Sequence, residues 1–172
     1  MIYGNEMIKN YISKHRLVEY HEDKQIEPAS VDMRLGNTWL VPVVTGSMVN
    51  LGDAVRYNRY EADSFVLHPG QFALATTMEK VNLPAHMAAF VQGRSSIGRI
   101  GLTVQNAGFV DPGFSGHITL ELVNESPNPI ILKSGYRVAQ LVFLKAFCVT
   151  EPYAGKYNGQ VEATGSRMQM DK

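Results

Sequence analysis

The sequence has one cysteine, no apolar run long enough to span a membrane, and no excess of charge of either sign. The single cysteine, Cys148, excludes an intrachain disulfide and a zinc site built from cysteines. Sixteen basic and sixteen acidic residues cancel, which argues against wholesale electrostatic binding to nucleic acid or to an anionic membrane. Because the first residues also lack the apolar region of a signal peptide, we expect a soluble, cytoplasmic protein with neither kind of partner.

Several catalytic motifs are absent as well. The chain has no G-x-S-x-G elbow, no Walker A sequence, no H-E-x-x-H, and no H-x-E with P-C-x-x-C as in the zinc nucleoside deaminases. Its five histidines have no ligand-like spacing: His15, His21, His68, His86 and His117. A zinc centre held by the protein is therefore not expected.

The patterning predicts one mostly β domain over residues 1–172. A short helix is expected in "NEMIKNYI", with Asn5 as its cap, and Cys148 is expected to be a buried small hydrophobe in "LVFLKAFCVT". Residues 45–63 have weak periodicity and are expected to form a long loop or an irregular hairpin. The polar final twenty residues, by composition alone, are expected to form a frayed tail. The remaining short β-rich runs and their turn residues favour an antiparallel barrel or sandwich with few helices; they are "TWLVPVV", "SFVLHPGQFALATT", "AAFVQG", "GLTVQNAGFV", "HITLELV", "PIILKSG" and "YRVAQLVFLKAF".

One residue stands out in "HITLELV". Ile118, Leu120 and Leu122 alternate as in a half-buried strand, which places Glu121 on the opposite face together with Thr119. Carboxylates are depleted in strands, and a desolvated one is costly unless it is paired or used. On this segment alone, a solvated glutamate or one paired with an arginine is the commoner case, and a catalytic carboxylate is the alternative.

Two further segments have residues suited to a nucleotide. "GRSSIGRIG" (93–101) follows a strand-like run and is expected to open a short helix, where backbone amides and arginine forks can bind phosphate; a tight turn with solvated arginines is equally compatible. In "VDPGF", Asp111-Pro112-Gly113 is a favourable turn sequence. Asp111 either bonds its own backbone, which is the commoner case, or faces a ligand hydroxyl.

In their order along the chain, these segments closely resemble the dCTP deaminase family of the dUTPase-like trimeric enzymes. The resemblance rests on "PASVDMRLGN", "LHPGQFALATTMEKVNLP", "GRSSIGRIGL", "NAGFVDPGFSGHITLELVN", "GYRVAQLVF" and "GKYNGQ". It implies a distorted antiparallel β-barrel with a few short helices, assembled as a homotrimer with shared active sites. It also implies deamination of dCTP without zinc, with Mg²⁺ bound through the triphosphate.

The resemblance also assigns roles to residues. Glu121 matches the catalytic glutamate, and a carboxylate can act as both base and acid when burial beside apolar groups raises its pKa. Ser95 and Arg99 are the expected pair that positions the attacking water, and residues 153–172 become a mobile segment that closes over the nucleotide. The matched phosphate and water loop is Arg94, Ser95, Ser96 and Arg99; the matched nucleotide-binding residues are Ile97, Gly98, Asp111, Thr119, Leu120, Gln140, Tyr153, Lys156 and Gln160.

Members of this family release dUTP or continue to dUMP and pyrophosphate. Those that only deaminate tend to carry a histidine and an arginine where this chain has Gly108 and Phe109, so we expect the dUMP-forming reaction, with Asp111 orienting the hydrolytic water. The resemblance further suggests dTTP as a feedback inhibitor, acting through a regulatory loop at Ala107 and Gly108. The alternatives are a deaminase that releases dUTP, a pure dUTPase, a non-catalytic nucleotide-binding protein and, last, a generic β-sandwich binding protein.

Overall fold

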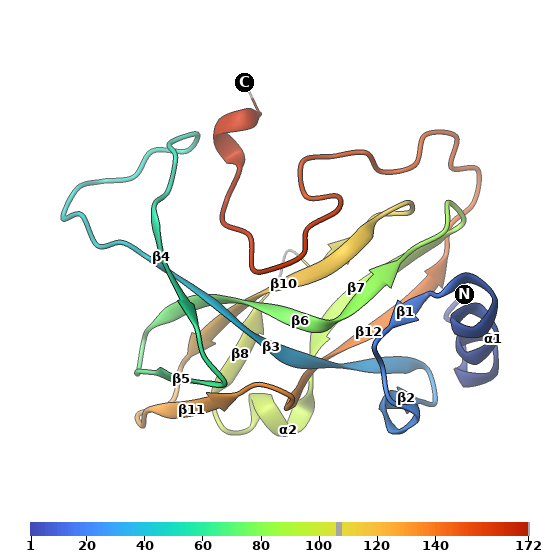
Figure 1. The fold of residues 1–172 in the computed structure, drawn as a ribbon, viewed down its shortest axis with the longest axis horizontal. Helices are drawn as coiled ribbons and strands as arrows, with labels where there is room; N and C mark the ends of the chain where they lie inside the picture. The colour runs from blue at the N-terminus through green and yellow to red at the C-terminus, as the bar shows by residue number, and fades with distance from the viewer. Residues whose placement is uncertain (106–107, 172) are drawn as a thin grey trace.

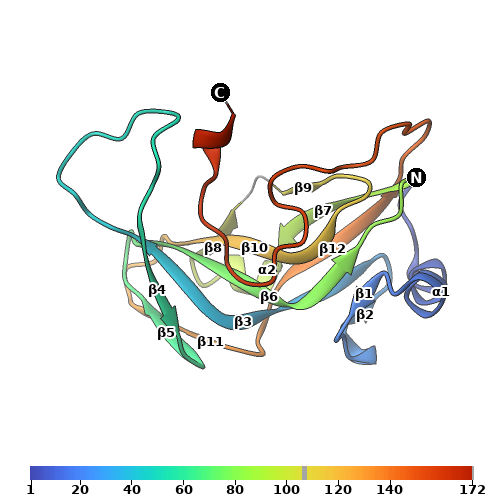
Figure 2. The same cartoon turned by 45° about the horizontal axis from the view of Figure 1, so that its top comes forward.

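The structure is a computed structural model that describes residues 1–105 and 108–171. Its body is a single curled antiparallel sheet with the main strand order β8-β10-β6-β3-β12-β7-β9, and a two-stranded sheet, β11-β5, lies beside it (Figures 1 and 2). The mostly β, barrel-like fold expected from the sequence is confirmed. The strands are β1 (Val18–Glu19), β2 (Ile26–Glu27), β3 (Ser30–Pro42), β4 (Tyr57–Glu61), β5 (Ser64–Leu67), β6 (Phe72–Asn82), β7 (Met87–Gly93), β8 (Leu102–Gln105), β9 (Phe109–Val110), β10 (Ser115–Asn124), β11 (Ile130–Lys133) and β12 (Arg137–Lys145).

The longest strand, β3, allows the sheet to curl because it changes partners along its length. It pairs with β12 near its start, with β6 in the middle and with β4 at its end. The β3–β6 register shifts between Leu35 and Trp39, and a β carbon at Gly36 would lie 2.6 Å from the Thr76 side chain. A glycine is therefore needed where the two strands approach each other at this irregularity.

The expected alternation in β10 is confirmed. Ile118, Leu120 and Leu122 are buried in the main core, whereas Thr119 and Glu121 lie on the other side of the sheet, which we call the outer face. The main core is centred on large, fully buried side chains such as Trp39 and Phe143. The strand period alone thus places Glu121 outside this core.

The helices are short and lie at the edges of the sheet. Ile8 anchors α1 to the core, and the helix begins one residue earlier than expected, with Gly4 rather than Asn5 at the cap position. Described residues contain no helix long and apolar enough to cross a membrane. The helices are α1 (Asn5–His15), α2 (Ser95–Gly98) and the 3₁₀ turns η1 (Asp23–Gln25) and η2 (Met168–Met170).

Three other local expectations concern residues 45–63, Cys148 and the C-terminal residues. The region 45–63 is the irregular hairpin: a long loop leads into β4, which pairs with β3. Cys148 is exposed and has a positive φ of 56°, so the expectation that it is buried was wrong; the strand ends at Lys145, before it. Residues 146–171 add no strand to the main sheet, and the C-terminal part of the chain instead lies across its outer face (Figure 1).

Candidate active site

Four neighbouring strands place one row of side chains across the outer face. The registers pair Arg59 of β4 with Leu40 of β3, Leu40 with Leu74 of β6, and Leu74 with Glu121 of β10. Directly paired residues project on the same side of a sheet. The row therefore runs from a cation at the edge, over two apolar side chains, to the carboxylate.

The C-terminal segment, residues 152–171, covers this face through hydrogen bonds to β10 and to the turn before it. His117 N–H donates to the Gln160 carbonyl at 2.9 Å, and Gln160 Nε2 donates to the His117 carbonyl at 2.6 Å. Thr164 N–H donates to Thr119 Oγ1 at 3.0 Å, and Tyr153 N–H donates to the carbonyl of Pro112 at 2.7 Å. These bonds join residues about forty positions apart, so they leave no pattern in the local sequence. For this reason composition alone predicted a frayed tail.

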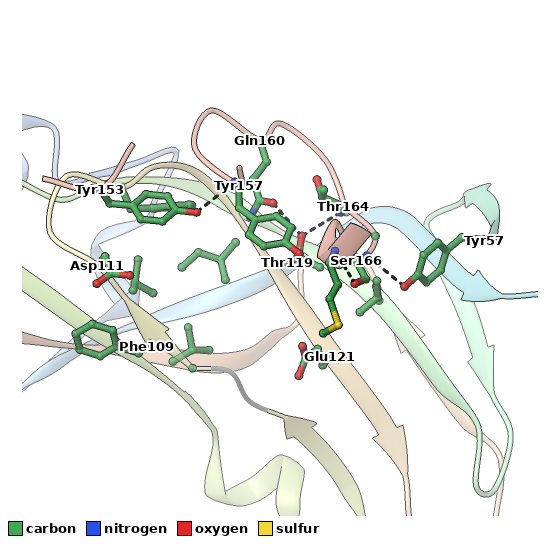
Figure 3. A pocket seen from close by; sticks show the side chains of 18 of the residues that line it. Tyr57, Phe109, Asp111, Thr119, Glu121, Tyr153, Tyr157, Gln160, Thr164 and Ser166 are labelled. Atoms are coloured by element: carbon green, nitrogen blue, oxygen red, sulfur yellow. Dashed lines mark hydrogen bonds between the residues drawn. The ribbon is translucent and has the colours of Figure 1, made fainter. Parts of the chain in front are cut away.

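Between the segment and the sheet lies a cavity of about 580 Å³ (Figure 3). Glu121, Thr119, Asp111, Tyr153 and Gln160 line it together with Gly108. Six residues that the sequence assigned to catalysis, to the nucleotide or to the regulatory loop are thus brought together by three separate segments: residues 108–111, β10 and the C-terminal segment. The other lining residues are Tyr57, Phe72, Leu74, Val91, Phe109, Val110, Phe114, Ile118, Tyr157, Thr164, Gly165, Ser166 and Met168.

Glu121 lies on the wall of this cavity rather than in a salt bridge. Its side chain is half-buried, and no ion pair to it is found within residues 1–105 and 108–171. Its direct cross-strand neighbours are Leu74 of β6 and Gln105 of β8. The carboxylate is therefore available to a ligand, whereas the arginine-paired alternative for this residue is not found among the described groups.

Asp111 begins the expected turn at the edge of the cavity. Phe114 N–H donates to the Asp111 carbonyl at 3.1 Å, and Gly113 has the positive φ of 93° that this turn needs. A β carbon at Gly113 would lie 2.6 Å from Pro152, so the glycine also lets the C-terminal segment pass close by. The Asp111 side chain is exposed and faces the cavity (Figure 3).

Gly108 approaches β7 closely through its backbone. Its carbonyl accepts from Val91 N–H at 2.7 Å, and a β carbon at residue 108 would lie 2.7 Å from the Val91 carbonyl oxygen. Any side chain here would therefore force the chain away from β7 or displace the strand. Ala107, the other residue assigned to the regulatory loop, lies outside the described residues.

The 94–99 segment forms the expected short helix but does not line the cavity. In Figure 1, α2 lies at the opposite end of the sheet from the C-terminal segment. Arg94 is held by a buried carboxylate: its Nε lies 3.0 Å from Asp32 Oδ2, and its Nη1 donates to the Arg137 carbonyl at 3.3 Å. Within one chain, therefore, Arg94, Ser95, Ser96, Ile97, Gly98 and Arg99 are separate from Glu121.

Asp32 sits between two arginines and is 1% exposed. Burial raises the pKa of the Asp32 carboxyl above its ordinary value, and the nearby guanidinium groups of Arg94 and Arg137 oppose that rise. Arg137 Nη1 lies 3.1 Å from the same oxygen, Oδ2, that Arg94 contacts. This carboxylate thus fixes the first residue of the 94–99 segment.

The remaining assigned residues lie elsewhere. Gln140 is paired with Asp32 and Gln92 in neighbouring strands, and its Oε1 accepts from Ser30 Oγ at 3.2 Å. Leu120 faces the core, so only its main chain could contact a nucleotide on the outer face. Lys156 forms an ion pair with Asp171 near the chain end.

Sequence reasoning did not identify about two-thirds of the residues that line the cavity. Tyr57 comes from the hairpin to which no role was given, and Thr164, Ser166 and Met168 come from the polar tail. The one available signal was Tyr57, an aromatic residue in a stretch with no periodicity. Its position in the wall depends on the pairing of β4 with β3, which local patterning does not specify.

A family model described as dCTP deaminase-like matches residues 2–146. A curated relative from Sulfurihydrogenibium, named "dCTP deaminase, dUMP-forming", is 44% identical over 100% of this chain and 99% of its own. A relative of the same name from Aquifex aeolicus is also 44% identical, over 100% of this chain and 97% of its own.

Solved structures are similar as well. The 2'-deoxycytidine 5'-triphosphate deaminase from Agrobacterium tumefaciens superposes with a TM-score of 0.65 at 25% identity, over 83% of this chain and 47% of that longer one. The dUTPase from Streptococcus mutans has a TM-score of 0.50 at 18% identity over 77% of this chain and 94% of its own, a likeness of fold alone.

Proposed function

This chain belongs to the dCTP deaminase-like family, and from that membership and the cavity at Glu121 we propose that it deaminates dCTP at cytosine C4 and hydrolyses the product to dUMP and pyrophosphate. The single observation that carries the proposal is the half-buried carboxylate of Glu121, which has no ion-pair partner among the described residues and lies on the wall of a cavity large enough for a nucleoside. The relatives named dCTP deaminase, dUMP-forming, support both halves of the reaction.

Glu121 is the proposed general base and acid. Its carboxylate takes a proton from a water molecule, the resulting hydroxide attacks C4, and the proton goes to the ring nitrogen N3. Glu121 then transfers the proton of the new C4 hydroxyl to the exocyclic amine; the C4–N bond breaks, ammonia leaves, and the C4 carbonyl of uracil forms. General acid–base catalysis of this kind contributes a factor of about 10²–10⁴ in rate.

The sugar and base would be held by the residues around Glu121. Thr119 and Gln160 already contact one another, with Thr119 Oγ1 and Gln160 Oε1 3.4 Å apart, and both side chains have hydrogen-bonding atoms for the nucleotide. Asp111 is the proposed acceptor for the 3′-hydroxyl of deoxyribose. The ring of Tyr153 lies across the cavity from β10, where Figure 3 shows it above Asp111.

We propose that a homotrimer completes the site. Arg94, Ser95, Ser96 and Arg99 have the chemistry to bind phosphate and position water, yet within one chain they lie away from the cavity. A loop supplied by a neighbouring subunit would resolve this separation, with Ser95 and Arg99 holding the attacking water. Light scattering tests the assembly, since a monomeric active enzyme would contradict a shared site.

Magnesium is proposed to enter with the substrate. Among the residues that the structure describes, no group of three or more His, Cys, Asp and Glu side chains could hold a metal ion. Mg²⁺ is commonly bound through substrate phosphates and water, and it would here neutralise part of the triphosphate charge. Lys156, near the start of the C-terminal segment, is a proposed further partner of the phosphates.

Gly108 supports the second reaction. With no side chain it lies against Val91, so that Phe109 and Asp111 line the cavity, and the space beside the sugar remains open for a hydrolytic water. A residue with a bulky side chain at position 108 could not lie this close to Val91. Asp111 is the proposed residue that orients this water toward the α-phosphorus.

The test is to incubate the purified protein with dCTP and Mg²⁺, with dUTP in parallel, and to separate the products by anion-exchange chromatography. Direct formation of dUMP and pyrophosphate from dCTP is expected. Accumulation of dUTP would show a deaminase that stops there, and turnover of dUTP alone would show a dUTPase.

Feedback inhibition by dTTP is the proposed regulation. Thymine resembles uracil, and dTTP carries the same triphosphate as the dUTP product. We therefore expect dTTP to bind the same site and to lower the rate when dCTP is subsaturating. An unchanged rate in the presence of dTTP would remove this part of the proposal.

A further inference from the structure

The hairpin formed by β3 and β4 presents a distinct surface to the C-terminal segment. Because side chains alternate along a strand, Tyr57 and Arg59 of β4 lie on the outer face, whereas Tyr60 lies on the other face. There the ring of Tyr60 packs against Phe65 with 6.0 Å between ring centroids. Tyr57 and Tyr60 thus form a matched pair on opposite sides of one strand.

Tyr57 contacts the segment with both its ring and its hydroxyl. Its hydroxyl oxygen accepts from Ser166 N–H at 3.2 Å (Figure 3). A β carbon at Gly165 would lie 2.5 Å from the ring of Tyr57. The glycine therefore allows the backbone to pass directly over the aromatic ring.

Three further contacts hold the preceding residues against the same hairpin or against β6 beside it. Arg59 Nη2 lies 2.7 Å from Glu162 Oε2, and Arg59 Nε donates to the same oxygen at 3.0 Å. Ala163 is buried against Leu40 and Leu74, in a small cluster separate from the main core, and its N–H donates to Thr38 Oγ1 at 3.3 Å. An ion pair, an apolar contact and two backbone hydrogen bonds thus join residues 162–166 to the hairpin or to the strand beside it.

We propose that the β3–β4 hairpin is the anchor of the C-terminal segment, and that Tyr57 and Arg59 are positioning residues for the nucleotide site. Residues 162–166 lie just after Gln160, and Thr164, Gly165 and Ser166 line the cavity. Holding them against the hairpin keeps this wall in place. Arg59 and Glu162 do not themselves line the cavity, so an effect of either on catalysis must act through the position of the segment.

The docking can be measured without a substrate by hydrogen–deuterium exchange of the peptide covering residues 160–168. Tyr57→Phe keeps the ring and removes the hydroxyl acceptor of Ser166, so exchange should become about two- to tenfold faster. Tyr60→Phe makes the same change on the opposite face and should leave the exchange of this peptide unchanged. Equal exchange in wild type and Tyr57→Phe would contradict the anchor.

A charge swap distinguishes the effect of the Arg59–Glu162 ion pair from a general loss of stability. Arg59→Glu places three carboxylates together, since Glu61 also contacts Arg59 at 3.2 Å, and Glu162→Arg likewise opposes two cations. Each single change should speed exchange by about two- to fivefold, the range measured for exposed ion pairs. The double variant restores the attraction and should return exchange close to wild type. Arg56→Glu is the control, because it reverses a charge in the loop before β4 that has no ion-pair partner among the described residues.

The catalytic role rests on the proposed function and is tested with the same variants. The ratio kcat/KM for dCTP should fall in Arg59→Glu and in Glu162→Arg by about the factor by which exchange rises, and should recover in the double variant. Faster exchange with unchanged kcat/KM would overturn the positioning role. If wild type does not convert dCTP, the proposed function fails, and the exchange measurements still decide whether the hairpin anchors the segment.

Discussion

Two glutamates in the middle of long strands have opposite environments in this protein. Glu79 of β6 is fully buried and accepts hydrogen bonds from Gln25 Nε2 at 2.8 Å, from Arg34 N–H at 2.8 Å and from Arg34 Nε at 2.6 Å. Glu121 of β10 faces a cavity and has no ion pair among the described residues. The protein supplies hydrogen-bond donors and a cation to one carboxylate, whereas the other lines a cavity without an ion-pair partner among the described residues.

This difference shows that a carboxylate in a strand does not by itself indicate catalysis. Burying a charge is tolerated where a cation and several donors compensate for the loss of water, as at Glu79. A carboxylate without such partners remains stable only where water or a ligand can reach it. The partners of a buried group, rather than its position in the strand, distinguish the structural residue from the functional one.

The largest expected effect follows from Glu121→Gln. The amide cannot take a proton from water, so kcat for deamination should fall by about 10²–10⁴-fold, while the free energy of unfolding changes by less than about 0.5 kcal/mol. Steady-state ammonia release and thermal unfolding measure the two quantities. A variant that still deaminates dCTP at the wild-type rate would remove Glu121 from its proposed role.

The same substitution at the other glutamate should have the reverse outcome. Glu79→Gln removes the charge that compensates Arg34 and should destabilise the fold by about 3–5 kcal/mol, which lowers Tm by roughly 2–4 °C per kcal/mol. The kcat of the folded fraction should stay near wild type. Thermal unfolding at one protein concentration is the measurement, and a large loss of kcat in a stable Glu79→Gln variant would contradict the comparison.

Asp111 adds a third carboxylate, at the edge of the cavity. Asp111→Asn should slow formation of dUMP by about 10²-fold and slow deamination by less than about tenfold, because the side chain is assigned to the sugar and to the hydrolytic water. Accumulation of dUTP from dCTP, followed by anion-exchange chromatography, is the expected sign. Equal slowing of both steps would assign Asp111 to binding alone.

The smallest effect is expected at Asp32 and depends on pH. Burial raises the pKa of this carboxyl in the folded protein, so the folded state binds a proton more readily than the unfolded state does. Stability from this group should therefore fall as pH rises from its ordinary pKa, about 3.9, through the raised value. The stability of wild type minus that of Asp32→Asn should decrease over this interval in chemical denaturation, and a difference that increases with pH would contradict the sign of the shift.

The local features of this protein follow directly from its amino-acid sequence. Strand alternation placed Ile118, Leu120 and Leu122 inside and Glu121 outside, and the Asp-Pro-Gly turn formed as expected. These features depend on neighbours in the chain, so the side-chain period and the turn preference of glycine are sufficient to predict them. The order of the motifs, through resemblance, also indicated the family.

Which residues line the cavity together depends on long-range contacts that the sequence does not reveal. Glu79 escaped notice because its partners Gln25 and Arg34 are 54 and 45 residues away, and Tyr57 because its contact with Ser166 spans 109 residues. The polar tail is held by hydrogen bonds to β10 and by one buried alanine, and neither produces a hydrophobic period. Contacts across such separations are fixed by sheet register and by the path of the backbone, which no local pattern of side chains encodes.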